Sequence, residues 1–272
     1  MINPLYHIQK PEGTEDLIAD CTLILQVDTN ALFYVLIYND KLVELKYFRL
    51  ETDDQDSFMM ELETVLQESL GNTSDLKKLV IIFNFPDNSL VPKQFYSPEI
   101  NREIIELVHG DLQKGTILSE EVKDWNLHNV YRIPSEVYEL IRNKFPTDGI
   151  WHFTTPWLHS LAGGEEGLKL IVFPGYIMIH LTRDGKLLIS QRFPYETDDD
   201  IYFYLLNLLD KFRVEAASTP LEVSGFILGD SSLLTNLRNY FPLMKLSTSK
   251  HVTGQFPAHF FSSILNVATC VL

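Results

Sequence analysis

The chain repeats part of its own sequence, and this repeat limits its possible folds more than any other feature. The segment LVELKYFRLETDD, which starts at Leu42, resembles LLISQRFPYETDD, which starts at Leu187, 145 positions later. A second pair follows in the same order, because IRNKFP at Ile141 resembles LRNYFP at Leu237, 96 positions later. Two ordered matches predict a duplicated unit whose first copy has 49 more residues between its two blocks, the difference between the two offsets.

Both copies show the same pattern of predicted elements. Short apolar runs separated by tight turns predict an antiparallel meander at 21–27, 31–38 and 42–49, and again at 169–173, 176–182 and 187–193. A helix follows each meander, and the repeated Thr-Asp-Asp before it is typical of a helix N-cap. The second of these helices is apolar on nearly all sides, so we expect it to be the more buried. A strand, a helix, a strand and a final helix complete each copy.

This order predicts an α/β protein with mixed sheets. We expect two β-β-β-α-β-α-β-α units, the first at residues 1–160 and the second at 161–272. Each unit needs its own apolar core, and the 45% of apolar residues is sufficient for two such cores.

The additional residues of the first copy predict an insertion at about residues 72–128. This region includes an apolar strand, a helix and a possible strand pair. The pattern leaves open whether 79–83 or 129–133 is the counterpart of the strand at 222–228 in the second unit. We expect the insertion to extend the first unit only.

Charge is distributed unevenly along the chain. The 22 Lys and Arg residues face 37 Asp and Glu residues, a net charge of −15, and residues 1–150 carry 26 of the acids and 13 of the bases. This balance argues against a nucleic-acid-binding protein, which needs a basic surface to neutralise phosphates. The acidic half predicts a solvated face, or alternatively a face that binds a basic partner.

The sequence also bears on location. Its longest unbroken apolar stretch, at residues 31–38, has eight residues, whereas a membrane-spanning helix needs about 20. The first ten residues show no basic start followed by an apolar core, as a secretory signal would. Its two cysteines, Cys21 and Cys270, are too far apart to indicate a metal site. We therefore expect a cytoplasmic protein without a transmembrane segment.

Familiar catalytic motifs give little support to an enzyme. Gly110 and Gly115 have the spacing of a phosphate-binding P-loop, but Thr116 stands where the loop needs a lysine. The sequence Gly-Asp-Ser ending at Ser231 is better explained as a helix N-cap than as a nucleophile. We expect neither catalytic residues nor a metal site.

The repeated element order resembles the ribonuclease-H-like unit that is duplicated in the actin-like ATPases. Within that superfamily the chain is similar to pilus-assembly and cell-division actin homologues, and it resembles a family of uncharacterised bacterial proteins with a degenerate version of the fold. The tract NVYRIPSEVYELIRNKFPTDGIWHF at residues 129–153, followed by the second meander, carries this resemblance.

The resemblance implies three nucleotide-binding loops, of which fragments are retained. Asp28 matches the acid of the first phosphate loop, where Asn30 replaces a glycine, a change that the left-handed preference of Asn tolerates. Gly175 matches the second phosphate loop, but Phe173 stands in place of its acid. Gly229 is the glycine retained from the adenosine loop. We expect the turns at 28–30 and 174–175 to face each other, with Gly229 at the rim of a degenerate nucleotide cleft.

These fragments favour a non-catalytic scaffold or adaptor that binds a protein partner and needs no cofactor. Losing the second acid removes a ligand for Mg²⁺ and for the attacking water. The partner is expected to bind through the insertion and the acidic first half. The alternative is a divergent ATP-binding protein or slow ATPase that uses Asp28 and Mg-ATP.

Overall fold

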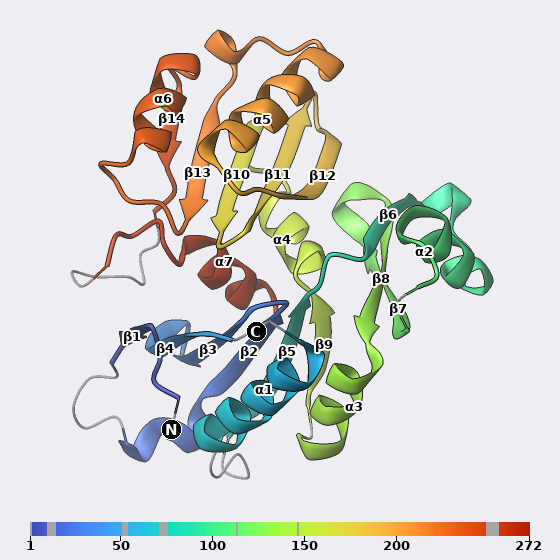
Figure 1. Ribbon diagram of the computed structural model, residues 1–272, viewed down its shortest axis with the longest axis vertical. Helices are drawn as coiled ribbons and strands as arrows, with labels where there is room; N and C mark the ends of the chain where they lie inside the picture. The colour runs from blue at the N-terminus through green and yellow to red at the C-terminus, as the bar shows by residue number, and fades with distance from the viewer. Residues whose placement is uncertain are drawn as a thin grey trace. The chain divides into compact units, whose positions relative to one another are not determined.

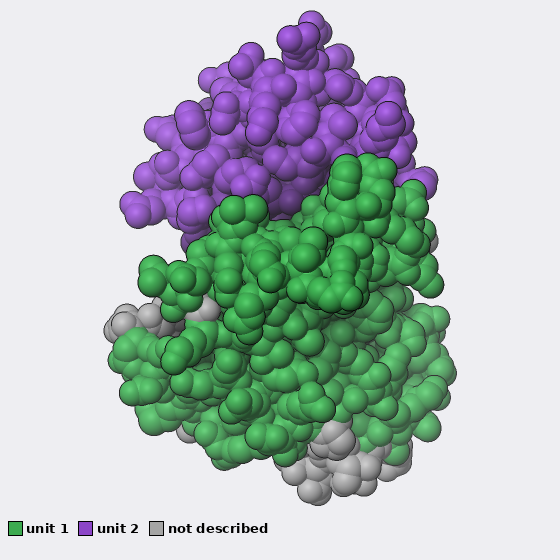
Figure 2. Space-filling model, turned by 90° about the vertical axis from the view of Figure 1, so that its right-hand side faces the viewer, with its two compact units in different colours: residues 1–159, 268–272 green, residues 160–267 purple. Residues whose placement is uncertain are grey.

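The computed structural model describes residues 2–9, 15–50, 54–70, 76–112, 114–145, 147–248 and 256–272. The chain divides into two compact units (Figure 2). Unit 1 comprises Met1–His159 together with Ala268–Leu272, and unit 2 comprises Ser160–Val267.

Unit 1 is built on a mixed sheet with the strand order β1-β4-β3-β2-β5-β9 among its described residues (Figure 1). The strands are β1 (Tyr6–Ile8), β2 (Thr22–Asp28), β3 (Ala31–Tyr38), β4 (Lys41–Arg49), β5 (Lys78–Asn84) and β9 (Gly149–His152). β2, β3 and β4 form the predicted antiparallel meander, whereas β5 runs parallel to β2 and β9 runs parallel to β5. α1 (Gln55–Leu70) and α3 (Ser135–Lys144) pack on one face of this sheet and close the core of unit 1.

Unit 2 has the strand order β12-β11-β10-β13-β14 in the part of the chain that the structure describes. Its strands are β10 (Gly167–Phe173), β11 (Tyr176–Arg183), β12 (Lys186–Pro194), β13 (Leu221–Gly225) and β14 (Met244–Leu246). α5 (Asp198–Phe212) and α6 (Ser232–Tyr240) pack on it around a second apolar core. Two further helices are α4 (Thr154–Leu161) and α7 (Ser262–Cys270). None of the described helices is long and apolar enough to cross a membrane.

Apart from β1, the two sheets share strand order, and their meanders also share register. The pairing of β3 with β4 shifts between Leu36 and Ile37, and the pairing of β11 with β12 shifts between Leu181 and Thr182, 145 positions later. A bulge at the same place in both meanders is what copies of one ancestral unit would retain. The duplication itself stays a prediction, which this correspondence supports.

The strand pairing identifies the counterpart that the sequence left open. Ile24 of β2 pairs with Val80 of β5, and Lys169, 145 positions after Ile24, pairs with Glu222 of β13. β5 is therefore the counterpart of β13. The predicted insertion boundary near residue 72 is corrected, because residues 78–84 belong to the main sheet. Residues 71–75 lie outside the described part of the chain.

The segment that unit 2 lacks is residues 85–134, which we call the insertion. It contains β6 (Asn88–Pro92), α2 (Asn101–His109), β7 (Gly115–Val122) and β8 (Leu127–Pro134). The strands form a small antiparallel sheet in the order β6-β8-β7, and α2 packs on it. Tyr131 and Ile133 of β8 are buried in the core of unit 1, so the insertion is anchored there.

The Thr-Asp-Asp of the second copy begins a helix. In unit 2, Thr197 is the N-cap of α5 and forms a capping box with Asp200. In unit 1, Asp54 accepts a hydrogen bond from the Ser57 amide at 2.8 Å at the start of α1; residues 51–53 lie outside the described residues. The expectation that α5 is the more buried of these two helices is not met, because α1 and α5 each have four buried residues among those described, and Phe203 of α5 is 64% exposed.

Candidate functional site

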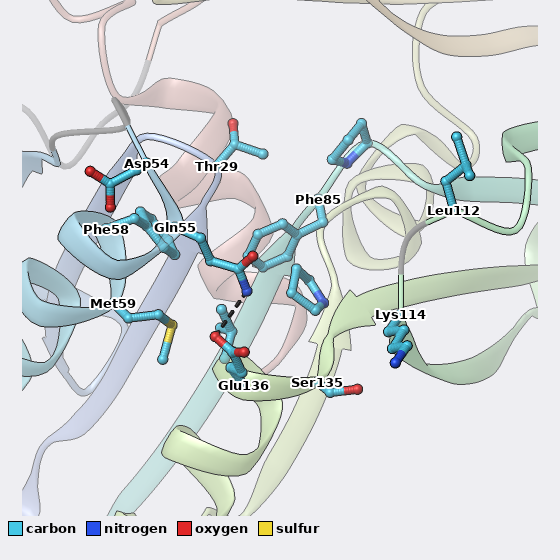
Figure 3. Close-up of a pocket in the computed structure, with 13 residues that line it drawn as sticks. Thr29, Asp54, Gln55, Phe58, Met59, Phe85, Leu112, Lys114, Ser135 and Glu136 are labelled. Carbon is cyan, nitrogen blue, oxygen red and sulfur yellow. Dashed lines mark hydrogen bonds between the residues drawn. The ribbon is translucent and has the colours of Figure 1, made fainter.

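A cavity of about 690 Å³ lies in unit 1, at the edge of the main sheet where β2 and β5 end (Figure 3). Thr29 follows β2, and Phe85 and Pro86 follow β5. These residues come together because the carboxyl ends of parallel neighbouring strands meet at one edge of a sheet. We call this space the unit 1 cavity.

Two helices and the insertion complete the wall. α1 begins at the cavity with Gln55, and α3 begins there with Ser135 and Glu136. The insertion contributes Leu112 and Lys114. Five segments that are separated in the sequence therefore build one cavity.

The floor of the unit 1 cavity is apolar and well packed. Phe58 of α1, Phe85 and Val137 of α3 line it, and all three are buried in the core of unit 1. Met59 lies beside them and is half-buried. A rigid apolar floor can receive an apolar group but offers few hydrogen bonds.

Charged side chains stand at the rim of the cavity. The Asp54 carboxylate accepts hydrogen bonds from the Ser57 amide at 2.8 Å and the Ser57 hydroxyl at 2.9 Å, which hold the pKa of Asp54 below its usual range. The Glu136 carboxylate accepts a hydrogen bond from Nε2 of Gln55 at 2.8 Å. The amino ends of α1 and α3 thus already carry carboxylates of the chain itself. A phosphate would be repelled there, although a helix N-terminus otherwise favours anions.

Asp28, predicted for the first phosphate loop, is buried at the end of β2, with 1% of its surface exposed. Its Oδ1 accepts hydrogen bonds from the Thr29 amide at 2.6 Å and the Thr29 hydroxyl at 3.1 Å. Its Oδ2 accepts a hydrogen bond from Nδ2 of Asn84, the residue opposite on β5, at 3.0 Å. Asn30 does not adopt the left-handed backbone that was expected of it, since its φ is not positive.

The corresponding turn in unit 2 is aromatic. Gly175 has a φ of +83°, as a phosphate-loop glycine could. Phe173, in place of the acid, is 2% exposed, and its ring stacks on Tyr176 with 4.8 Å between centroids. The Arg192 guanidinium lies 3.3 Å from the centroid of the Tyr176 ring. The position that needs a carboxylate is thus filled by a buried aromatic stack.

Gly229 lies in the exposed turn before α6. A Cβ added there would meet no atom within 4 Å, and its φ is not in the left-handed region, so the backbone does not require a glycine. Ser231 caps α6 by accepting a hydrogen bond from the Leu234 amide at 3.3 Å, as predicted. Asp28 and Asn30 belong to unit 1, whereas Gly175 and Gly229 belong to unit 2. The cleft that these four residues would form stays a prediction.

Sequence reasoning missed a buried carboxyl group between the insertion and the main sheet. Glu120 of β7 accepts hydrogen bonds from the Tyr131 hydroxyl at 2.5 Å and from the His152 amide of β9 at 2.8 Å. Burial raises the pKa of Glu120 to about 7, although hydrogen bonds from Thr155, Tyr131 and the His152 amide act in the opposite direction. No pattern in the sequence indicates this group, because its environment is created by three separate segments.

The described residues contain no group of three or more His, Cys, Asp or Glu side chains that could hold a metal ion. Of the residues that line the unit 1 cavity, Thr29 belongs to a turn that the sequence singled out, and Asp54 belongs to the repeated Thr-Asp-Asp. The extra length of the first copy also pointed toward this region.

Comparison with known proteins places the chain in a family and a fold. The model of a family described as "Protein of unknown function (DUF3822)" matches residues 11–243. No curated protein sequence gives a significant match. Among solved structures, the chain is similar to a protein of Bacteroides thetaiotaomicron with an actin-like ATPase fold and unknown function. The TM-score is 0.76 at 15% identity, over 93% of this chain and 97% of that one.

Two further structures share the fold at low identity. The type IV pilus biogenesis complex PilM-PilN gives a TM-score of 0.63 at 12% identity, over 92% of this chain and 98% of that chain. The ethanolamine utilization protein EutJ of Carboxydothermus hydrogenoformans gives 0.52 at 10% identity, over 98% and 92%. The predicted fold class and the predicted resemblance to actin-like ATPases are thus confirmed.

Proposed function

The chain belongs to the DUF3822 family, and on that premise and its actin-like ATPase fold we propose that it is a non-catalytic cytoplasmic scaffold or adaptor. The observation that carries this proposal is Phe173. A ring that is 2% exposed and stacked on Tyr176 occupies the position where the ATPases of this fold are expected to have an acid.

The residues present do not fit Mg-ATP. Mg²⁺ is bound through carboxylates, phosphates and water, and an aromatic ring supplies no oxygen ligand. The remaining acid, Asp28, already accepts hydrogen bonds from Thr29 and Asn84 within its own unit. Moving that carboxylate toward a hydrated metal would leave the buried amide of Asn84 without this bond, which costs about 1–3 kcal/mol.

A relative of the same fold supports a role in protein assembly. PilM was solved in a complex with PilN, a type IV pilus biogenesis complex. We propose that the present chain likewise acts by holding a protein partner. The fold alone does not fix function, so the proposal depends on a binding measurement.

Isothermal titration of the full chain with Mg-ATP tests the proposal, together with a phosphate-release assay. We expect neither saturable binding at micromolar ATP nor hydrolysis above a blank. Asp28→Asn is the matched variant, because an Asn side chain can still form a hydrogen bond with Asn84. Micromolar affinity in the natural chain that Asp28→Asn abolishes would overturn the adaptor function.

The same titration decides the second candidate, a divergent ATP-binding protein or slow ATPase. Two observations support it: Asp28 sits at the end of β2, and Gly175 retains the left-handed backbone of a phosphate loop. Phe173 counts against it, since the aromatic stack leaves no second acid. A melting temperature raised by Mg-ATP, but not by Mg²⁺ alone, would favour this candidate.

A further inference from the structure

We propose that the unit 1 cavity receives a short extended segment of the protein partner, in which a large apolar side chain stands beside a lysine or arginine. The inference rests on the proposed adaptor function and names the site and the chemistry of its partner. The volume of the unit 1 cavity, about 690 Å³, lies in the range of sites that enclose a small ligand or a few side chains.

The apolar floor of the cavity favours the binding of an apolar side chain. Phe58, Phe85 and Val137 present carbon surface, and Met59 provides a flexible side chain that can adapt to different shapes. At the rim, Leu112 is 96% exposed and offers further apolar surface to a partner. An apolar side chain placed on this floor would cover both Leu112 and the cavity wall.

The carboxylates at the rim favour a basic residue next to that apolar side chain in the partner segment. Asp54 and Glu136 are exposed carboxylates on the helix side, while Lys114 stands on the insertion side (Figure 3). A lysine or arginine near Glu136 would form a charge-assisted hydrogen bond, and Lys114 can donate to a main-chain carbonyl of the segment. Because the carboxylates and Lys114 lie on opposite sides of the cavity, the basic side chain of the bound segment should lie toward α1 and α3.

The charge of the first half of the chain reinforces this choice. Residues 1–150 carry 26 acidic and 13 basic side chains, so a basic segment is attracted from a distance, and an acidic or phosphorylated one is repelled. The charge complementarity is therefore the same at the cavity and over the acidic half of the chain.

Selection of a phage-displayed library of random heptapeptides on the full chain tests the proposal. We expect enriched peptides to share a Phe, Leu, Ile or Met within two positions of a Lys or Arg. One such peptide, synthesised with a fluorophore, is then titrated with the chain and followed by fluorescence anisotropy. Failure to enrich peptides, or enrichment of acidic ones, would overturn the proposal.

Two matched pairs of variants locate the binding site. Glu136→Lys should weaken peptide binding by about tenfold or more, while Glu139→Lys, at another exposed position on the same helix, should change it less than about twofold. Leu112→Glu should weaken binding, whereas Leu107→Glu, on α2 and 87% exposed, should not. All four side chains are exposed, so the variants should fold.

A charge exchange adds a stricter criterion. A peptide in which Glu replaces the basic residue should bind Glu136→Lys better than it binds the natural chain. If binding is the same for Glu136→Lys and Glu139→Lys, or for Leu112→Glu and Leu107→Glu, the peptide lies elsewhere and the proposal is overturned. A dimer in sedimentation that Leu112→Glu dissociates would show a second copy as the occupant, which also overturns it.

The Mg-ATP titration on the same preparation distinguishes failure of the cavity proposal from failure of the adaptor function. Without ATP binding and without peptide binding, the cavity proposal fails and the adaptor function stands. Micromolar ATP binding that depends on Asp28 removes the adaptor function and the cavity proposal with it.

Discussion

Apart from the edge strand β1 of unit 1, units 1 and 2 have the same strand order, and they share the same bulge. They differ at the edge of the sheet where the central strands end. In unit 1 this edge carries Asp28 and Asn84, which are joined by a hydrogen bond at 3.0 Å. In unit 2 the corresponding residues are Phe173, the last residue of β10, and Phe226, which follows β13. The same sheet edge thus carries a hydrogen-bonded polar pair in one unit and two aromatic residues in the other.

The connection after this edge differs as well. Unit 2 passes from β13 to α6 through residues 226–231, whereas unit 1 inserts residues 85–134 between β5 and α3. The cavity with the apolar floor and the charged rim exists where the insertion meets the sheet. The comparison teaches that the shared sheets supply stability, and that the loops at one edge determine what each unit can bind.

The difference between the units can be measured separately in each. The three tryptophans, Trp125, Trp151 and Trp157, all belong to unit 1, so tryptophan fluorescence reports on that unit, while far-UV circular dichroism reports on both. Each unit has its own apolar core.

The largest effect is expected from making unit 2 resemble unit 1 at Phe173. Phe173→Asp removes a buried ring and places a carboxylate in the apolar space that the ring occupied. This change should lower the stability of unit 2 by at least about 4 kcal/mol. Urea denaturation followed by circular dichroism should show this loss, with the tryptophan transition little changed. Phe203→Asp, on the 64% exposed position of α5, is the control and should cost less than about 0.5 kcal/mol. Equal losses in the two variants would contradict the aromatic stack.

The next effect is an opposite response of the two units to pH. Burial raises the pKa of Glu120 in unit 1 to about 7 from 4.5, so its contribution to stability is fully present below pH 4.5 and is lost as the pH rises through 7. The shift corresponds to about 3 kcal/mol. Burial lowers the pKa of His180 in unit 2 to about 3 from 6.5, so its contribution is present above pH 6.5 and is lost as the pH falls toward 3.

Urea midpoints at several pH values between 5 and 8 test this contrast. The tryptophan-monitored midpoint of unit 1 should fall with rising pH, and Glu120→Gln should flatten that slope, because the neutral amide mimics the protonated acid. Tyr131 and His152 are the titratable residues that the structure places against Glu120, and both remain in the variant. For unit 2, His180→Val installs the residue found at the corresponding position of β3, Val35, and should remove the opposite slope. Parallel slopes in the natural chain would refute the assignment.

Short sequence patterns predicted those features of the two units that depend only on residues close together in the chain. The meanders follow from apolar runs between tight turns, and the Thr197 cap follows from Thr-Asp-Asp before an apolar helix. The role of residues 79–83 did not follow, because an apolar run indicates a buried strand and not which strand it pairs with. The correction came from the pairing of Ile24 with Val80.

The candidate site was predictable only in part. Asp28 and Phe173 were identified because a loop resemblance assigns them directly. The unit 1 cavity was not, since Thr29, Leu112 and Glu136 lie far apart in the sequence and converge only through the fold. Glu120 was missed for the same reason: its environment depends on three segments that pack together.

A smaller effect is expected at the polar pair of unit 1. Asp28→Ala removes the acceptor of the Asn84 amide and of the Thr29 amide, and Asn84 is itself buried. The loss should be about 2 kcal/mol, visible in the tryptophan transition and absent from the unit 2 transition. Asp28→Asn should recover part of it. If Asp28→Ala leaves the urea midpoint unchanged, the carboxylate is not held within the unit, and its availability to a ligand would have to be reconsidered.

The smallest effect separates the two helix caps. Thr197→Ala removes the capping box of α5 and should cost unit 2 about 1 kcal/mol. Asp54→Ala removes the carboxylate that accepts hydrogen bonds from the Ser57 amide and hydroxyl at the start of α1, and should destabilise unit 1 alone. Each loss should therefore appear in one transition, in circular dichroism for Thr197→Ala and in tryptophan fluorescence for Asp54→Ala. Asp54 also stands at the rim of the unit 1 cavity, so Asp54→Ala should weaken the basic peptide as well, which Thr197→Ala should not. A cap variant that shifts both transitions together would mean that the two units unfold as one. Tryptophan fluorescence and circular dichroism would then not report the stabilities of the two units separately.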